Sequence, residues 1–340
     1  MFFDKSRYSI FVFSLLITVC FFNKISLSTD EYGLNDDIMY KDNIYQNKKN
    51  YIQENKYTAL ITAKYEILNV KMDELLYNTT GAYKVSELNY RHKNVSLATF
   101  GLEFFPVDKF TIGAIGSFSF HKGKLKFDDY DWMDKNDNIT QNWQQHSWCD
   151  KGKFNYTLLD VYLKYMLFNI GYLNDKGVLS GFFGVGVQYR NTNLEIIGGS
   201  YWYNNGATTG SFDDITMHKY VQKSILPYWM FTLKYHYKNF EAFFVFKHSA
   251  FNKFKAKDIH VARGFSNTFK YGNVFYYNIV MNAGYWINKN VKFFIECQVF
   301  NTKGKTQKLE LRDEKDKVTK QYIKNSNFGY LFSLGATFGF

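Results

Sequence analysis

The sequence predicts an all-β protein: a transmembrane, antiparallel, up-and-down β-barrel of ten strands with long extracellular loops. Three observations support this prediction. Aromatic residues make up 20 % of the chain and there are only 2 prolines, a composition that suits pleated, half-buried strands and keeps their backbone donors available. The first residues have the pattern of a secretory signal. The last segment alternates in side-chain character down to Phe340.

The N-terminus is expected to be a signal peptide. Lys5 and Arg7 precede an apolar run over 8–22, and Ser26 and Ser28 supply small residues two positions apart. A basic region, a short apolar run and such a cleavage site are typical of secretory signals, so we expect residues 1–28 to be removed. A retained membrane anchor is the alternative. No later run approaches the roughly 20 apolar residues that a membrane helix needs.

The rest of the chain is expected to be a polar leader, residues 29–55, followed by one barrel over 56–340. The predicted strands lie near 57–70, 84–105, 109–121, 154–168, 178–195, 218–237, 240–254, 268–287, 291–302 and 327–340. The short gaps between them are typical of periplasmic turns. The long gaps, expected to be extracellular loops, are 122–153, 196–217, 255–267 and 303–326.

The C-terminal segment is the clearest strand. Large, mostly aromatic residues occupy alternate positions from Phe328 to Phe340, and mostly small residues such as Gly329 and Gly339 stand between them. A period of two places the two sets on opposite faces, as in a barrel strand with one lipid face and one lumen face. A soluble β-sandwich also explains the alternation, but not its combination with a signal peptide.

Charge and cysteine content limit the partners. The formal net charge is +11, but the basic residues are scattered and the chain is expected to be exported. We therefore expect contact with an anionic lipid surface and none with nucleic acid. Outside the signal, Cys149 and Cys297 allow one disulfide by count without requiring it. We expect a monomer.

Two pairs of residues could carry chemistry: Asp129 with Asp131, and Asp258 with His260. Positions i and i+2 of an extended chain point to the same side, and both pairs follow strands that run toward the extracellular mouth. A carboxylate beside an imidazole raises its basicity, so the histidine can take a proton from water. A second acidic pair across a cleft would hold that water. Either pair alone is more often a solvated surface turn.

These residues resemble the motifs of the omptins, a family of outer-membrane aspartyl-type endopeptidases built as ten-stranded barrels. The family carries Asp-x-Asp-Trp in its second outer loop and Asp-x-His in its fourth. Both occur here in the same order, as Asp129-Tyr130-Asp131-Trp132 and Asp258-Ile259-His260. The resemblance runs from about Tyr57 to Phe340. It implies that Asp258 and His260 activate a water and that the two other acids orient it. It implies no covalent intermediate, metal or cofactor.

The resemblance also bears on the substrate. Omptins usually cut between basic residues and use two acids in the pocket for the residue before the cut. Glu74 fits one acid, whereas Ala256 stands at the position of the other. One acid grips an arginine less firmly than two, so we expect a basic preference that is relaxed or shifted. Ser147 fits the position of a serine once considered a nucleophile, and a supporting role in substrate binding is expected for it.

Lipid binding is a further expectation from the family. Omptins bind lipopolysaccharide through basic residues on the outer wall, which makes this lipid a candidate activator. Lys223 and Lys270 lie near two of these positions, but Asn191 replaces an expected arginine.

The predicted function is therefore a cell-surface endopeptidase of the bacterial outer membrane, with its active site facing outside. The alternative is a non-catalytic omptin-like barrel that acts as an adhesin or binding protein. A small porin is less suitable, because a ten-stranded barrel is too narrow for general permeation.

Overall fold

The computed structural model describes residues 57–78, 83–132, 143–171, 177–203, 206–261, 264–304, 307–312 and 318–340. The predicted signal peptide and leader lie outside these residues. Among the described residues no helix is long and apolar enough to cross a membrane. The strands are β1 (Ala59–Tyr77), β2 (Lys84–Val107), β3 (Phe110–His121), β4 (Lys124–Asp131), β5 (Gln145–Cys149), β6 (Gly152–Gly171), β7 (Val178–Ile197), β8 (Ser200–Tyr203), β9 (Thr208–Ser211), β10 (Thr216–Tyr237), β11 (Phe240–His260), β12 (Phe265–Trp286), β13 (Val291–Lys303), β14 (Gln307–Arg312) and β15 (Val318–Gly339).

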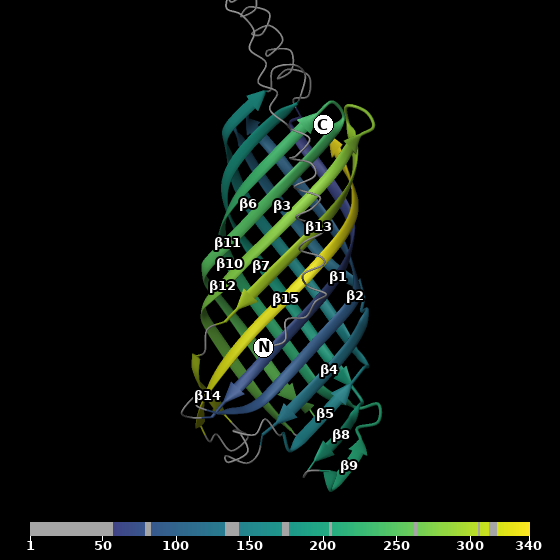
Figure 1. Cartoon of the computed structure of the whole chain (residues 1–340), viewed down its shortest axis with the longest axis vertical. Coiled ribbons are helices and arrows are strands. Elements are labelled where there is room, and N and C mark those ends of the chain that lie inside the picture. The colour runs from purple at the N-terminus through teal and green to yellow at the C-terminus, as the bar shows by residue number, and fades with distance from the viewer. Residues whose placement is uncertain are drawn as a thin grey trace, which may run out of the picture. The chain divides into compact units, whose positions relative to one another are not determined.

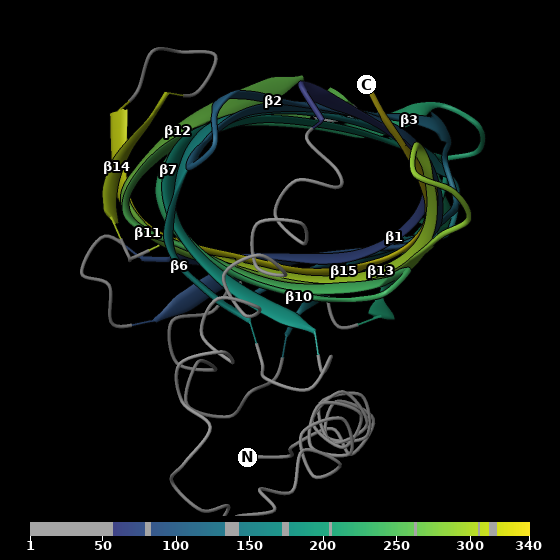
Figure 2. The ribbon, with the colours of Figure 1, turned by 90° about the horizontal axis from the view of Figure 1, so that it is seen from above.

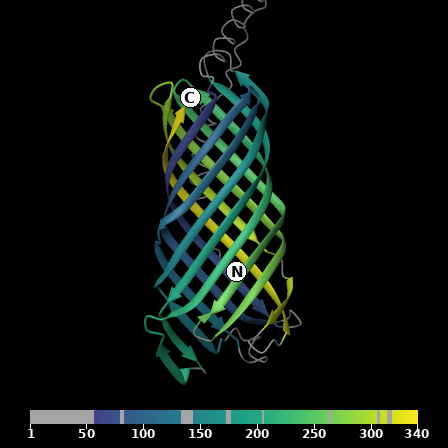
Figure 3. The same cartoon turned by 180° about the vertical axis from the view of Figure 1, so that it is seen from behind.

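Ten long strands close into an antiparallel ring, in the order β1-β15-β13-β12-β11-β10-β7-β6-β3-β2, and β2 pairs back onto β1. Figures 1 and 3 show the tilted strands from two sides, and Figure 2 shows that the ring is flattened in cross-section. Closure removes the unpaired edges that would otherwise expose backbone donors and acceptors. The predicted ten-stranded up-and-down barrel is confirmed.

The remaining strands extend the wall at one end of the barrel. β4 pairs with β2, and β5, β8 and β9 continue from it, while β14 pairs with β15. These strands gather at the lower end in Figure 1. The prediction that 122–153, 196–217 and 303–326 are loops was wrong in part, because backbone groups there pair with neighbouring strands. β11 likewise continues to His260, beyond its predicted end at residue 254.

An apolar belt covers the outer wall in the other part of the barrel. The exposed large apolar side chains there include Phe100, Leu102 and Phe104 on β2, Leu159, Val161 and Leu163 on β6, Phe183, Val185 and Val187 on β7, and Phe332, Leu334 and Phe338 on β15. On β15, Leu331 and Thr337 point inward and are buried, which confirms the alternation of the last strand. On β1 the exposed large apolar residues end at Tyr65, so the later part of that strand lies beyond the belt.

Ion pairs fill the lumen inside the belt. Lys247 reaches Asp160 at 2.6 Å, and Lys64 reaches Glu296 at 2.8 Å. A charge taken out of water needs such a partner. Toward the extended end the interior becomes an aromatic and aliphatic core, which includes Tyr90, Phe127, Tyr220 and Phe269. The described lumen is therefore packed with side chains, and this packing sets the walls on which the site residues stand.

Candidate active site

Asp258 and His260 are in direct contact near the end of β11. Nε2 of His260 lies 2.9 Å from Oδ2 of Asp258, and the Asp258 side chain is almost completely buried. The two residues share a face because they are two positions apart on a strand. They were predicted in a loop over 255–267, and that placement was wrong: β11 continues through both residues because its backbone pairs with β10 and β12.

A second histidine, which sequence reasoning missed, completes the group. His218 on β10 pairs across the ladder with His260, and its Nε2 lies 2.7 Å from Oδ1 of Asp258. The hydroxyl of Tyr90 on β2 lies 2.9 Å from the same nitrogen. The carboxylate of Asp258 thus has one imidazole at each oxygen. All of these residues stand beyond the apolar belt.

Asp129 and Asp131 lie on β4, not in a loop as predicted. Asp129 pairs with Leu88 on one side and with Ser147 on the other, and it is buried. β4 pairs side by side with the first part of β2, and β2 and β11 stand half-way round the ring from each other. The acidic pair and the Asp258–His260 pair therefore belong to opposite walls.

Tyr90 links these two walls electrostatically. Burial raises the pKa of its hydroxyl well above the ordinary value, and the charges of Asp258, Glu74, Tyr220 and Asp129 raise it further. Asp258 belongs to one predicted pair and Asp129 to the other, so one residue of each pair acts on this hydroxyl.

Glu74 lies on β1 and is 1 % exposed. Tyr220 and Tyr271 donate hydrogen bonds to its Oε2 at 3.0 and 3.3 Å. Burial and, next, repulsion from Asp258 raise the pKa of Glu74 to about 8. Ala256 lies on β11, four strands round the ring from β1, and is fully buried between β10 and β12. The carboxyl group of Glu74 is therefore neutral at pH 7 as long as no cationic group approaches it.

Ser147 lies on β5 and is 3 % exposed. Its Oγ is 3.0 Å from the hydroxyl of Tyr203, and the residue is paired opposite Asp129. Its neighbour His146 points to the other face, where its ring stacks on Tyr130 with the centroids 4.3 Å apart. Adjacent strand residues face opposite sides, so the two do not form a nucleophile and base pair.

The predicted lipid-binding lysines belong to one row across three strands. Lys223 on β10 pairs with Lys255 on β11, and Lys255 pairs with Lys270 on β12. Lys223 and Lys255 are exposed, and only the backbone position of Lys270 is described. The predicted alternatives for the cysteines are resolved: Cys149 and Cys297 are both free thiols.

His218, Asp258 and His260 are also the residues that could hold a metal ion. Their three ligand atoms all lie within 4.8 Å of one another, and two imidazoles with one carboxylate are a donor set that suits zinc. The same contacts are those of a hydrogen-bonded chain that needs no metal.

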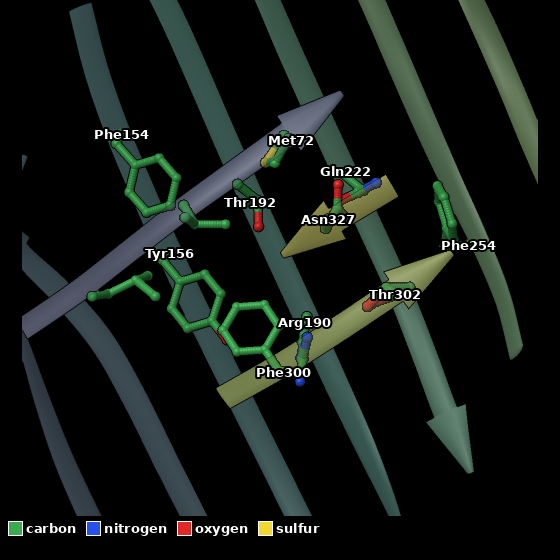
Figure 4. Close-up of a pocket in the computed structure, with 13 residues that line it drawn as sticks. Met72, Phe154, Tyr156, Arg190, Thr192, Gln222, Phe254, Phe300, Thr302 and Asn327 are labelled. Carbon is green, nitrogen blue, oxygen red and sulfur yellow. The ribbon is translucent and has the colours of Figure 1, made fainter. Parts of the chain in front are cut away.

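A cavity of about 30 Å³ lies deeper in the lumen, lined among others by Met72, Arg190, Gln222, Phe300 and Asn327. Figure 4 shows Gln222 close to Asn327, and the amide of Asn327 donates to Gln222 at 2.8 Å. This space holds about one water molecule. None of the four predicted catalytic residues lines it, so it is not the predicted substrate site.

Comparison with known proteins gives consistent matches. A model of the omptin family matches residues 55–340. A plasminogen activator from Yersinia pestis is 31 % identical over 255 residues, which cover 74 % of this chain and 79 % of that protein. Protease 7 of Escherichia coli (strain K12) is 26 % identical over 273 residues, covering 76 % and 83 %.

The fold has a solved counterpart. The crystal structure of the outer membrane protease OmpT from Escherichia coli superposes with a TM-score of 0.75 at 22 % identity, and it covers 85 % of this chain and 100 % of that one. The family model spans the whole described barrel. Because this match covers well over half of the sequence, the chain belongs to the omptin family.

Proposed function

We propose that this protein is an outer-membrane endopeptidase that cleaves peptides and proteins at the cell surface. The observation that carries the proposal is the contact between Nε2 of His260 and Oδ2 of Asp258 at 2.9 Å. Family membership supports it, since the relatives include proteins named protease 7 and outer membrane protease OmpP. In this proposal His260 is the general base.

In this proposal the hydrogen bond to Asp258 sets the tautomer of His260. When Nε2–H donates to Oδ2, the lone pair of the ring is on Nδ1. Nδ1 therefore takes the proton from a water molecule as the water oxygen attacks the scissile carbonyl carbon. The buried carboxylate stabilises the imidazolium that forms. His260 then gives the proton to the leaving amine as the C–N bond breaks.

Asp129 and Asp131 orient the attacking water in this scheme. Both stand on β4, on the wall opposite β11, so a substrate between the walls would have acids on one side and the base on the other. A water held by a carboxylate keeps a lone pair aimed at the carbonyl. The chemistry uses no acyl-enzyme, which agrees with the burial of Ser147 against Tyr203.

Glu74 is proposed to recognise the residue before the cut. Its Oε1 is buried and has no hydrogen-bond partner among the described residues. A guanidinium or ammonium group would satisfy this oxygen and draw the carboxyl into its charged form. We therefore propose a preference for basic residues, weaker than one built on two acids, because Ala256 adds no charge.

The membrane setting follows from the belt and the lysine row. The apolar belt would sit in the outer membrane, and the extended end that carries the site would face outside. The row of Lys223, Lys255 and Lys270 lies on neighbouring strands. Like charges directly opposite one another disfavour the sheet, and the phosphates of lipopolysaccharide would neutralise them.

The test is cleavage of a peptide library by the folded barrel, with and without lipopolysaccharide. We expect His260→Ala to abolish cleavage and Asp129→Ala to reduce it about 100-fold or more. Unchanged cleavage by both variants would refute the mechanism. A wild-type barrel that binds the peptides without cutting any of them would instead support the non-catalytic binding function.

A further inference from the structure

His218 is a buried histidine in contact with the proposed catalytic pair. Its Nε2 lies 2.7 Å from Oδ1 of Asp258, while Nε2 of His260 lies 2.9 Å from Oδ2. We propose that His218 is a positioning residue that holds Oδ1 of Asp258, so that Oδ2 stays directed at His260. This inference rests on the proposed function, because it assigns a role within the same site.

The ladder between β10 and β11 brings the two histidines together. His218 is the direct cross-strand partner of His260, and the ring centroids are 4.7 Å apart with the planes nearly perpendicular, at 85°. Directly paired residues project to the same face of a sheet. The carboxylate of Asp258, two positions before His260, therefore lies between the two ring nitrogens.

Packing fixes the ring of His218 in this orientation. The ring of Phe127 lies 5.5 Å away, and the hydroxyl of Tyr90 lies 2.9 Å from Nε2. His218 is 2 % exposed. A side chain this enclosed does not reach a substrate, so any effect on the reaction passes through Asp258. For this reason we call it a positioning residue and not a catalytic one.

The charge of Asp258 explains why a second partner is useful. Burial alone works to raise the pKa of this carboxyl, and His218 and His260 outweigh it and hold the pKa below the ordinary value. The charge of Asp258 also acts on Glu74 on β1, where it adds to burial in raising the pKa of that carboxyl. A buried carboxylate with one oxygen unsatisfied would be destabilised and would turn away from His260.

The experiment compares His218→Ala with His218→Gln in the full-length, folded protein. Loss of the 2.7 Å polar contact with a buried carboxylate should lower kcat roughly tenfold to a hundredfold, with KM within about twofold because no substrate contact is lost. His218→Gln keeps an N–H donor at the same reach and should restore most of kcat.

A matched control is His92→Ala. His92 is 1 % exposed, and neither of its ring nitrogens has a hydrogen-bond partner among the described residues. The substitution removes a buried imidazole that does not contact the proposed catalytic pair, so kcat should stay unchanged. A wild-type kcat in His218→Ala would overturn the inference, and so would equal impairment of His218→Ala and His218→Gln. The proposed function fails separately, if His260→Ala still cleaves.

Discussion

Tyr220 on β10 donates a hydrogen bond to Oε2 of Glu74 on β1 over 3.0 Å, and so joins strands that stand half-way round the ring from each other. Tyr271 donates to the same oxygen over 3.3 Å. Oε1 of Glu74 remains without a hydrogen-bond partner among the described residues. A buried carboxyl with one bonded oxygen and one open oxygen is prepared to receive a donor group from a substrate.

Glu74→Gln should therefore change the choice of substrate more than the chemistry. The amide keeps the size of the side chain and its contacts with the tyrosines, but it loses the charge that binds a guanidinium. We expect kcat/KM for peptides with arginine before the cut to fall roughly tenfold or more, with little change for peptides with leucine there. The ratio of the two rates is the measurement. An unchanged ratio would show that the pocket assignment is wrong.

The same residue predicts a pH-dependent preference. Burial and the charge of Asp258 raise the pKa of Glu74 to about 8, so the carboxyl of the empty site is neutral below that pH and charged above it. The preference for arginine over leucine should rise between pH 6 and pH 9. Titration of the catalytic groups changes the cleavage rates of both peptides equally, so it cancels in the ratio of the two rates. Glu74→Gln, which does not titrate, should give a flat ratio over the same range.

The sequence predicted the barrel because the pattern of a membrane strand is local. Alternation in the last strand needs no knowledge of the neighbouring strands, and Phe332 and Leu334 are exposed as expected. The ends of the strands were less predictable. Asp129 and Asp258 stand among polar residues that look like loops, and only pairing with β2, β5, β10 and β12 extends the strands through them.

His218 could not be found by counting from the turn. The turn between Tyr237 and Phe240 would pair His218 with Ile259, on the face opposite to Asp258. One extra residue in β11, between the partners of Ile225 and Trp229, shifts the register so that His218 pairs with His260. A one-residue shift exchanges the two faces of a strand, and the sequence does not reveal where such a bulge lies.

Ser147→Ala should leave catalysis nearly intact. The hydroxyl of Ser147 meets that of Tyr203 at 3.0 Å, and His146 lies on the other face of β5. Because the adjacent imidazole points away from this hydroxyl, we expect kcat to stay within about threefold of wild type, in contrast to Asp129→Ala. A serine-directed covalent inhibitor should likewise leave no adduct, which mass spectrometry of the intact protein can check. Labelling of Ser147 would contradict the water mechanism.

The lysine row should couple activity to lipid. Lys223→Ala and Lys255→Ala each remove one of two directly opposed positive charges. We expect weaker stimulation by lipopolysaccharide, and equal or higher thermal stability in lipid-free detergent, because the repulsion is relieved. Lys151→Ala is the control, since that exposed lysine lies 3.3 Å from Asp214 and outside the row. Full stimulation of the double variant would exclude the row as the lipid contact.

A chelator separates the two chemistries that the group of His218, Asp258 and His260 could support. Their ligand atoms lie within 4.8 Å of one another, which suits a metal, yet the contacts at 2.7 and 2.9 Å are also those of a hydrogen-bonded chain. If the three side chains work without a metal, activity should survive prolonged EDTA treatment. The metal content of the protein is followed by elemental mass spectrometry. Loss of activity together with a bound metal, and recovery on adding zinc, would mean that the three residues hold a metal that would activate the water. His260 would then be a ligand instead of a base.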